Sequence, residues 1–589
     1  MTIGPRPSLD PTLLVAAILA TCVPTLLAYN RPPSATALNQ CLAVALWGLM
    51  AAMTFTKVDA PRKYWRQLGA LIGAIGLVAA AALGSWAFGT LPLSLALQAV
   101  GLLAGAALLA ACGASAARSP NAPSAFCTLA IGLLLAGMAS SAVGIIQVYA
   151  PAWIDGDWIG QSAYAHRAVG NLRQPNHFCT LLQWSLIAAV ALHEMRWLPR
   201  AALWTVTLVL VWAIQLSTSR TGAAGFLLLL GWAILDRRLS RSARFILGAT
   251  PVLYAMAFGV TAIFDSITQT SIGDSGKLMG ASGWATDNSR FGIWRSTLDM
   301  IATQPWTGVG FGEFNFAWTL TPIANRAPVL FDNCHNFLLQ LAVELGIPGA
   351  VMVTSLLLFA LWQSLQQARR SKGPAGIVPS AGLMIVLIIG LHSMVEFPLW
   401  YAYFLFPAAL AWGFALGAPS ADSEATIQPP TRVEALSGAS WGLVAGLLMS
   451  FTGAWSLLDY QRVILIYTGQ YSDAERSERI EQGQRSLLFA HQADYTAALS
   501  TTSSPLGRDL GFVRGIHVIL DSKMMLAWAR KLAAQGQVDP ARWVLQRMRE
   551  FHTPDVEAYF APCKEPSAIA FQCEIPVENY TWRNFAASK

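Results

Sequence analysis

Charge is what this sequence has least of. Only 12% of its 589 residues are Asp, Glu, Lys or Arg, whereas hydrophobic residues make up 54%. Soluble proteins carry roughly twice that share of charge. The balance excludes a disordered chain, because disorder requires low hydrophobicity, and it excludes an ordinary cytosolic enzyme. Eight cysteines in so long a chain also exclude a small disulfide-dense scaffold.

The shortage of charge ends about three quarters of the way along the chain. Residues 1–459 hold 42 charged residues, whereas the much shorter segment 460–589 holds 29. The second density is close to that of a soluble domain. We therefore predict a polytopic membrane catalytic domain over 1–459 and a globular helical domain over 460–589.

Thirteen apolar runs in the first domain are long enough, or nearly so, to cross about 30 Å of hydrocarbon as helices. They predict an all-α fold with about 12–13 transmembrane helices. The first run could be a signal peptide, but no cleavage site precedes Tyr29 and many spans follow, so we expect an uncleaved helix. The runs lie near 12–29, 36–56, 68–87, 92–112, 126–149, 176–195, 201–218, 220–235, 245–264, 337–362, 378–395, 400–417 and 436–458.

The loops between these runs differ in Lys and Arg content, which predicts the orientation of the chain. Alternate loops counted from the N-terminus hold 16 Lys/Arg, and the opposite set holds 8 despite being longer. The short basic loop Asp236–Arg244 contributes most to this difference. The N-terminus is therefore predicted inside and the C-terminal domain outside. No basic patch with interleaved aromatic residues is present, so we expect no nucleic-acid partner.

The C-terminal domain contains two cysteines, Cys563 and Cys573, ten residues apart. Outside the membrane such a pair can form a disulfide, although two unrelated thiols remain the alternative. Residues 527–551 read as two helices around a turn at Gly536, like a tetratricopeptide hairpin or a generic helical hairpin. We expect this domain to be a docking or lid module. The other six cysteines have no metal-ligand spacing and are expected to pack.

Two outer loops, about 150–175 and about 265–336, are long and rich in polar residues. The first ends in a dense cluster that contains Arg167, Arg173, Gln174 and Asn176 and leads into a helix. Such donors at a helix N-terminus are typical of an anion-binding rim. The simpler alternative is that Asn176 only caps the helix.

Further arginines occur on the outer side, where the usual bias disfavours them. Arg220 lies in the tight turn 217–222 and is predicted to bind phosphate, with a snorkelling side chain as the alternative. Arg290 belongs to an amphipathic helix expected from residue 287 to about Gln304. The glycine run 308–312 follows no strand, so it is not a dinucleotide fingerprint. We expect it to be a turn close to a ligand or to the membrane surface.

His335 is the candidate general base, because a neutral imidazole at the outer start of a helix can accept a proton. A lone histidine is more often structural, but three polar clusters accompany this one. Asn336, Gln340 and Glu344 recur every four residues and share one helix face, which could also bind neighbouring helices.

A last outer turn, residues 392–403, contains Glu396, Tyr401 and Tyr403. Glu396 could pair with an outer arginine, and the tyrosines could equally form an interfacial aromatic belt. Taken with the candidate base and the absence of a Walker loop, a Ser-His-Asp set or a metal-ligand cluster, these groups suit a metal-independent transferase that uses a lipid-diphosphate donor on the outer leaflet. No cofactor is expected.

Three segments resemble a known family. The segment 335–349, which begins His335-Asn336-Phe337-Leu338-Leu339-Gln340, resembles the signature of the O-antigen ligase/polymerase (Wzy_C) superfamily. The segment Gly170-Asn171-Leu172-Arg173-Gln174-Pro175-Asn176-His177 is similar to a box of PglL-type protein O-oligosaccharyltransferases, as are His392–Tyr403 and the outer C-terminal domain. The resemblance covers most of residues 150–589.

This resemblance implies a bacterial inner-membrane enzyme with its active site and C-terminal domain in the periplasm. It implies transfer of a preassembled glycan from undecaprenyl diphosphate to Ser or Thr of periplasmic proteins, often pilins. On that analogy His335 activates the acceptor hydroxyl, Arg220 and Arg290 hold the diphosphate, and Gln174 and Tyr403 line the substrate sites. The choices between Arg167 and Arg173, and between Tyr401 and Tyr403, stay open.

Other readings share parts of this pattern. The same chemistry could serve lipid A-core, as in an O-antigen ligase, or a growing glycan, as in a polymerase. A polytopic transporter is the alternative from another class, but it predicts polar residues at the bilayer midplane and repeated halves. Here the polar clusters gather on the outer side, and no internal repeat is visible.

Overall fold

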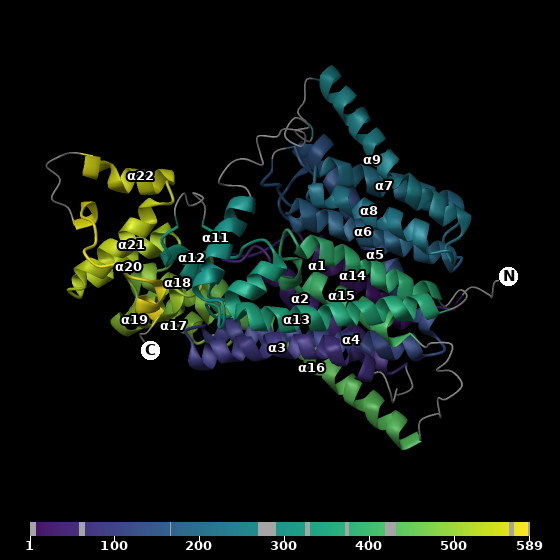
Figure 1. Cartoon of the computed structure of the whole chain (residues 1–589), viewed down its shortest axis with the longest axis horizontal. Coiled ribbons are helices and arrows are strands. Elements are labelled where there is room, and N and C mark those ends of the chain that lie inside the picture. Colours follow the sequence, from purple (N-terminus) through teal and green to yellow (C-terminus); the bar gives the residue numbers. More distant parts are fainter. Residues whose placement is uncertain are drawn as a thin grey trace. The chain divides into compact units, whose positions relative to one another are not determined.

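The computed structural model describes residues 7–57, 65–164, 166–268, 272, 290–323, 330–371, 376–418, 432–564 and 571–586. Within these ranges the chain forms helices joined by turns and loops, with no β-strand (Figure 1). The predicted all-α fold is confirmed.

A helix lies over each of the thirteen apolar runs. Seven of these helices are long and apolar enough to cross a membrane, and shorter apolar helices accompany them, as in a multi-pass membrane protein. The thirteen are α1 (Pro11–Leu26), α2 (Ala37–Phe55), α3 (Trp65–Phe88), α4 (Leu93–Arg118), α5 (Ala122–Tyr149), α6 (Pro175–Glu194), α7 (Arg200–Leu216), α8 (Arg220–Leu235), α9 (Arg241–Thr268), α13 (Phe337–Arg370), α14 (Ile377–Ser393), α15 (Ala402–Gly417) and α16 (Arg432–Thr468).

The helices form two compact units whose limits do not coincide with residue 459. The first unit comprises residues 1–75, 102–280 and 355–457. The second comprises residues 76–101, 281–354 and 458–589. The C-terminal segment therefore folds together with two segments from the first three quarters of the chain. Each unit is described by itself below.

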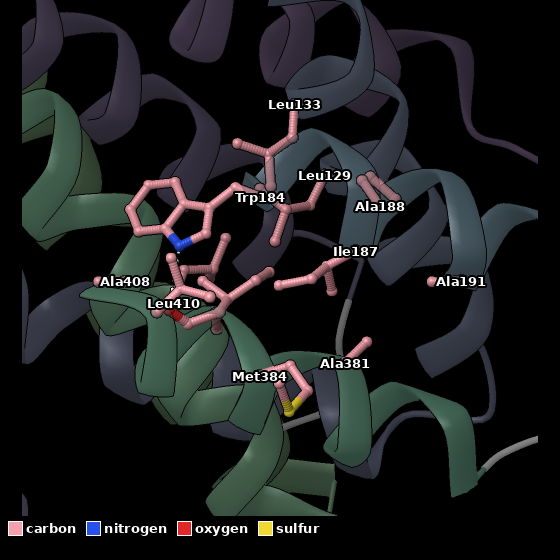
Figure 2. Packing of buried hydrophobic residues seen from close by; sticks show 14 of the residues in the cluster. Leu129, Leu133, Trp184, Ile187, Ala188, Ala191, Ala381, Met384, Ala408 and Leu410 are labelled. Carbon is pink, nitrogen blue, oxygen red and sulfur yellow. Dashed lines mark hydrogen bonds between the residues drawn. The ribbon is translucent and has the colours of Figure 1, made fainter. Parts of the chain in front are cut away.

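Trp184 of α6 lies in the core of the first unit (Figure 2). Its ring is fully buried, and its indole N–H donates to the carbonyl of Ile385 in α14 at 3.0 Å. Leu133 of α5 and Leu410 of α15 belong to the same cluster. The hydrogen bond matters because lipid tails compete well for an apolar ring but cannot satisfy an indole N–H.

Glycine lets α4 and α15 approach each other backbone to backbone. A Cβ atom on Gly413 would lie 2.1 Å from the carbonyl oxygen of Ala110, and one on Gly113 would lie 2.1 Å from that of Leu410. Close contact of this kind is the main source of helix association where no hydrophobic gain is available.

In the second unit, the described residues of the C-terminal part form α17 (Asp473–Gln484), α18 (Ala490–Leu499), α19 (Pro505–Gly515), α20 (Ser522–Ala534), α21 (Val538–Arg549), α22 (Pro554–Phe560) and α23 (Trp582–Ala586). The hairpin expected around Gly536 is α20 and α21, with Gly536 in the left-handed region at φ 78°. Cys563 and Cys573, the pair expected outside the membrane, are joined in a disulfide.

The long loop 265–336 contributes α11 (Arg290–Thr303) and α12 (Phe314–Leu320) to the second unit. The first corresponds to the expected amphipathic helix; residues 287–289 lie outside the described residues. Phe316 and Leu320 of α12 belong to the same buried cluster as Met524, Trp543 and Phe551 of the C-terminal part. Loop and C-terminal domain thus share one hydrophobic core.

We expect Gly413→Ala to destabilise the first unit, because the added methyl group would collide with the backbone of α4 and force the helices apart. The loss should be about 1–3 kcal/mol, the range for overpacked cores. Gly231→Ala in α8 is the matched control, since nothing lies within 4 Å of the added carbon. Thermal unfolding in detergent measures both, and equal midpoints would contradict the close packing.

The second prediction concerns Asp494 of α18, which is 1% exposed. The carboxylate accepts from Gln484 Nε2 at 2.9 Å, but burial still raises its pKa from 3.8 to about 6. The carboxyl group of Asp494 thus has a higher pKa in the folded protein than the value near 4 that it has in the unfolded chain. Its contribution to the free energy of unfolding is therefore fully present below pH 4 and is lost as the pH rises through 6. Asp494 therefore opposes folding at neutral pH.

Asp494→Asn, which keeps the acceptor for Gln484, should stabilise the protein at pH 7.5 by up to about 3 kcal/mol. The difference from wild type should shrink below pH 6 and vanish below pH 4. Unfolding midpoints measured across this range check the prediction. Buried His491, whose pKa burial lowers to about 4, is common to both proteins and cancels. A pH-independent difference would show that the titration of Asp494 is not its cause.

Candidate functional site

The polar box 166–177 is an ordered turn of the first unit. Gly170–Leu172 form a short 3-10 helix, and Gln147 of α5 reaches into it with both ends of its amide. Gln147 Oε1 accepts from the N–H groups of Val169 and Gly170 at 3.0 and 2.9 Å, while Nε2 donates to the carbonyls of Gly160 and Gly170. One buried amide thus satisfies four backbone groups of the loop.

The cap of α6 is Gln174, which excludes the alternative that Asn176 only caps this helix. Gln174 Oε1 accepts from the N–H of His177 at 2.7 Å, and Pro175 is the first helical residue. Proline suits that position because its missing N–H would have had no partner within the helix. The side chain of Asn176 therefore does not cap α6 and can bind other groups.

Asn176 instead joins three of the polar clusters found in the sequence. Its Oδ1 accepts from Ser219 Oγ at 2.6 Å, and its Nδ2 donates to Glu396 Oε1 at 3.4 Å. Ser219 belongs to the turn that precedes Arg220, and Glu396 belongs to the turn 392–403. The structure therefore brings the box, the Arg220 turn and the Glu396 turn together.

Arg167 and Arg173 both bind backbone carbonyls. Arg173 donates through its two terminal nitrogens to Ala35 O, at 2.7 Å, and to Ala28 O, both in the connection between α1 and α2. Arg167 donates through Nε to Ser217 O at 2.9 Å, in the Arg220 turn. Arg173 thus holds the connection between α1 and α2 in place, whereas Arg167 binds the turn that contains Arg220.

Arg220 is the first residue of α8 and its side chain is exposed. Ser219 caps this helix by accepting from the N–H of Gly222 at 2.9 Å. The turn is anchored to α6 by Gln183, whose amide donates to Gly222 O at 2.7 Å. A guanidinium at an exposed, anchored helix N-terminus can bind an anion with the help of the helix dipole.

The turn 392–403 places its two tyrosines in different environments. Tyr403 is 3% exposed, whereas Tyr401 is half-buried. The Tyr401 ring lies 4.7 Å from the ring of His177, and the backbone N–H of Ala402 donates to Gln40 Oε1 at 2.7 Å. Of the two tyrosines, Tyr401 is therefore the more exposed.

In the second unit, His335 forms part of a tight turn before α13. Its backbone is left-handed at φ 54°, an uncommon conformation for a residue with a side chain. The N–H of His335 donates to Asn333 Oδ1 at 3.1 Å, and Asn336 caps α13 by accepting from the N–H of Leu339 at 3.0 Å. The amide side chains of Asn333 and Asn336 thus hold the backbone from which the His335 side chain extends.

The polar face of α13 supports the same turn. Gln340 Oε1 accepts from the N–H of Cys334 at 3.0 Å, and Gln340 Nε2 donates to Glu344 Oε1 at 2.8 Å. Gln340 and Glu344 therefore lie on one face, as their spacing predicts. Their role is to hold the backbone beside His335.

The glycine run 308–312, expected to form a turn close to a ligand or to the membrane surface, lies against α13. Gly346 has non-helical dihedral angles within α13 (φ 74°, ψ 167°), so helical hydrogen bonding is interrupted there. The N–H groups of Val309 and Gly310 donate to the carbonyls of Val343 and Glu344 at 2.8 and 3.0 Å. A Cβ on Gly308 would lie 2.4 Å from the Glu344 carbonyl, which explains the glycine.

Arg290 begins α11, and Trp294 follows one turn later on the same face. The indole of Trp294 donates to the carbonyl of Cys334 at 3.0 Å, so this face of α11 is directed to the His335 turn. The second unit therefore carries the candidate base together with one candidate phosphate ligand, and the first unit carries Arg220.

Gln147 and Gln183 of these networks were missed by sequence reasoning. Both lie inside apolar helices, where a single polar residue gives no hint of its partner. Their signal was the cost of a polar side chain at membrane depth, which makes each one a candidate for a buried contact. His177, in the first turn of α6, is 5% exposed, and its Nδ1 has no hydrogen-bond partner among the described residues.

Comparison with known proteins matches three adjoining stretches of the chain. A family described as O-antigen ligase matches residues 205–354, and one described as virulence factor membrane-bound polymerase, C-terminal, matches residues 380–561. A third, described as protein glycosylation ligase, matches residues 168–193, which contain the Gln174 cap and Asn176.

Two curated relatives come from Acinetobacter baylyi. A general O-oligosaccharyltransferase is 26% identical over 283 residues, which cover 46% of this chain and 48% of that protein. A ComP-specific O-oligosaccharyltransferase is 24% identical over 258 residues, which cover 43% of this chain and 44% of that protein. The chain spans about half the length of the curated relatives it matches. Residues 205–354 are thus similar to the O-antigen ligase family, and residues 168–193 are similar to the protein glycosylation ligases, in line with the two relatives named as O-oligosaccharyltransferases.

Proposed function

We propose that this chain is an oligosaccharyltransferase that moves a preassembled glycan from undecaprenyl diphosphate to Ser or Thr hydroxyl groups of periplasmic proteins such as pilins. The observation that carries the proposal is the His335 turn, an imidazole on a strained and fully braced backbone within the stretch matched as O-antigen ligase. Strained backbone held by its surroundings is common at functional sites.

In the proposed reaction the imidazole of His335 takes the proton of the acceptor hydroxyl. The hydroxyl oxygen forms a bond to the anomeric carbon of the glycan while the bond from that carbon to the diphosphate oxygen breaks. Undecaprenyl diphosphate leaves with the electron pair of that bond, and one direct displacement inverts the anomeric configuration. General-base assistance of this kind contributes typically 10²–10⁴-fold in rate.

Arg220 and Arg290 are the proposed ligands of the leaving diphosphate, with Arg167 beside Arg220. Guanidinium groups bind phosphate oxygens through charge-assisted, often bidentate hydrogen bonds. Both residues begin helices, where the helix dipole adds to the attraction for an anion. Positively charged guanidinium groups next to the departing diphosphate would stabilise the negative charge that develops on it in the transition state.

The Asn176–Glu396 pair, with Gln174 and Tyr401, is the proposed polar wall for the glycan or the acceptor. Amides, a carboxylate and an aromatic ring can recognise sugar hydroxyl groups without charge neutralisation. Asn336, which caps α13, is proposed to bind substrate next to His335. Tyr403 and Arg173 are proposed to support the Asn176–Glu396 wall. The pattern of Lys and Arg supports placement in the bacterial inner membrane with these groups on the periplasmic side.

Lipid A-core and a growing glycan are the alternative acceptors. The match of residues 168–193 to protein glycosylation ligases favours a protein, whereas the match of residues 380–561 to membrane-bound polymerases keeps glycan extension in view. The relatives named as O-oligosaccharyltransferases support a protein acceptor.

The acceptor is tested by expressing the chain with a pathway for a lipid-linked glycan and with a periplasmic pilin that bears Ser and Thr. We expect intact mass spectrometry to show the pilin heavier by one whole glycan, lost when its acceptor hydroxyl is replaced by alanine. Glycan that appears only on lipopolysaccharide, or only as longer glycan chains, would contradict the protein acceptor while leaving the transferase class intact.

The base is tested by His335→Asn, because asparagine tolerates left-handed backbone well and should preserve the turn. Removal of the imidazole should lower transfer by roughly 10²–10⁴-fold at unchanged membrane insertion. His552→Asn is the matched control, since His552 is exposed, has a left-handed φ of 47° and pairs only with Glu557 among the described residues. Equal activity of the two variants would rule out His335 as the base.

A further inference from the structure

Asn315 of α12 connects the segment before His335 to the C-terminal helices. It is 6% exposed, and both ends of its amide form hydrogen bonds. Asn315 Nδ2 donates to the carbonyl of Phe331 at 2.9 Å, and Asn315 Oδ1 accepts from the N–H of Leu520 at 2.7 Å. All three residues belong to the second unit.

We propose that Asn315 is a positioning residue for His335, and that the C-terminal domain sets the orientation of the imidazole through it. The inference rests on the proposed role of His335 as the base. It changes the expected role of the C-terminal domain, which the sequence indicated as a docking or lid module.

The first link runs from Asn315 to the imidazole. Phe331 is four residues before His335, and the two rings meet edge to face with centroids 5.8 Å apart and planes at 87°. The Phe331 ring also contacts Trp318 of α12, with centroids 6.0 Å apart. Because Asn315 binds the Phe331 backbone and Trp318 contacts its ring, the Phe331 ring that His335 contacts is held in place by α12.

The second link runs from α12 to the C-terminal domain. Glu313, immediately before the helix, accepts from Thr90 Oγ1 at 2.9 Å and lies 2.7 Å from His517 Nδ1 through its other oxygen. Glu313 and His517 are both buried. The ring of His517 also packs on Phe316, with centroids 4.3 Å apart. The start of α12 is therefore held to the C-terminal part at residues 313, 315 and 316.

The other end of the turn has its own supports, Gln340 and Trp294, which bind the backbone of Cys334. His335 is thus braced on one side by α13 and α11 and on the other by Phe331. Loss of the Asn315 bond should leave the first brace intact. The imidazole would then move without unfolding the turn, which is the behaviour of a positioning residue.

An amide is needed at residue 315 because the two partners have opposite requirements. Leucine has a similar shape but offers neither a donor nor an acceptor. Aspartate can accept from Leu520 but, when ionised, cannot donate to Phe331. Asn315→Asp therefore preserves the link to the C-terminal domain and breaks the link to the His335 segment, and Asn315→Leu breaks both.

Thr319→Val is the matched control. Thr319 lies one turn later on α12, is fully buried, and its hydroxyl has no hydrogen-bond partner among the described residues. Valine has nearly the same shape, so this change perturbs the same helix without removing a bond.

The experiment uses the full chain in detergent with a lipid-linked glycan donor and a Ser-bearing acceptor peptide. We expect Asn315→Asp and Asn315→Leu to lower kcat about tenfold to a hundredfold, the effect of a misplaced catalytic group, with KM for the peptide changed less than twofold. Thr319→Val should leave both unchanged. A rise in KM at constant kcat, or equal effects of all three changes, would overturn the proposal.

Hydrogen exchange followed by mass spectrometry gives a readout independent of activity. Peptides covering residues 330–336 should exchange faster in both Asn315 variants, whereas those covering α20 and α21 should be unchanged. Unchanged exchange at 330–336 would overturn the proposal even if the protein proved to have a different acceptor or no transferase activity.

A second variant covers the case in which Asn315 substitutions prevent folding. His517→Phe keeps a ring against Phe316 but removes the donor to Glu313 from the C-terminal side, and it leaves Asn315 itself in place. It should again accelerate exchange at 330–336 and lower kcat more than it changes KM. Exchange and kinetics that match wild type would show that the C-terminal domain does not position His335.

Discussion

The need to satisfy backbone N–H and C=O groups in irregular segments governs how each of the two units holds its candidate residues. A helix satisfies its own backbone, but the turns at residues 170, 219 and 335 cannot, and an unpaired group costs several kcal/mol where water is scarce. Amide side chains supply the missing partners. Gln147, Gln183 and Gln340 each extend from a helix into one of these turns. The turns can therefore hold Arg220 and His335 on a fixed backbone.

This constraint explains how far the sequence could be read. Apolar runs predicted all thirteen helices, because the hydrocarbon thickness imposes a length that composition reveals. The same sequence pattern located the polar clusters, because side chains such as Arg220, Asn176 and Glu396 are costly near lipid unless they are paired or take part in function. Family resemblance supplied their proposed roles, and the family itself is supported by matches to three stretches of the chain.

What the sequence could not give was the partner of each polar group. Asn176 looks like a helix cap because asparagine is a good one, but Pro175 shifts the helix start so that Gln174 takes that position. The glycines at 308–312 look ready for a ligand, and only the break at Gly346 shows that they fill a gap against another helix. Gln174 precedes Asn176 by two positions, and Gly346 lies far along the chain from the glycine run. Composition carries no information on such pairings.

The shared core of α12 and the C-terminal helices has a consequence for the construction of chimaeras. A boundary drawn at residue 459, where the charge density changes, would separate Phe316 and Leu320 from Trp543 and Phe551. Exchange of the C-terminal segment alone between relatives would therefore pair half of one core with half of another. The transferable piece is the discontinuous set of residues 76–101, 281–354 and 458–589. If acceptor choice resides there, it will move between relatives only when all three segments move together.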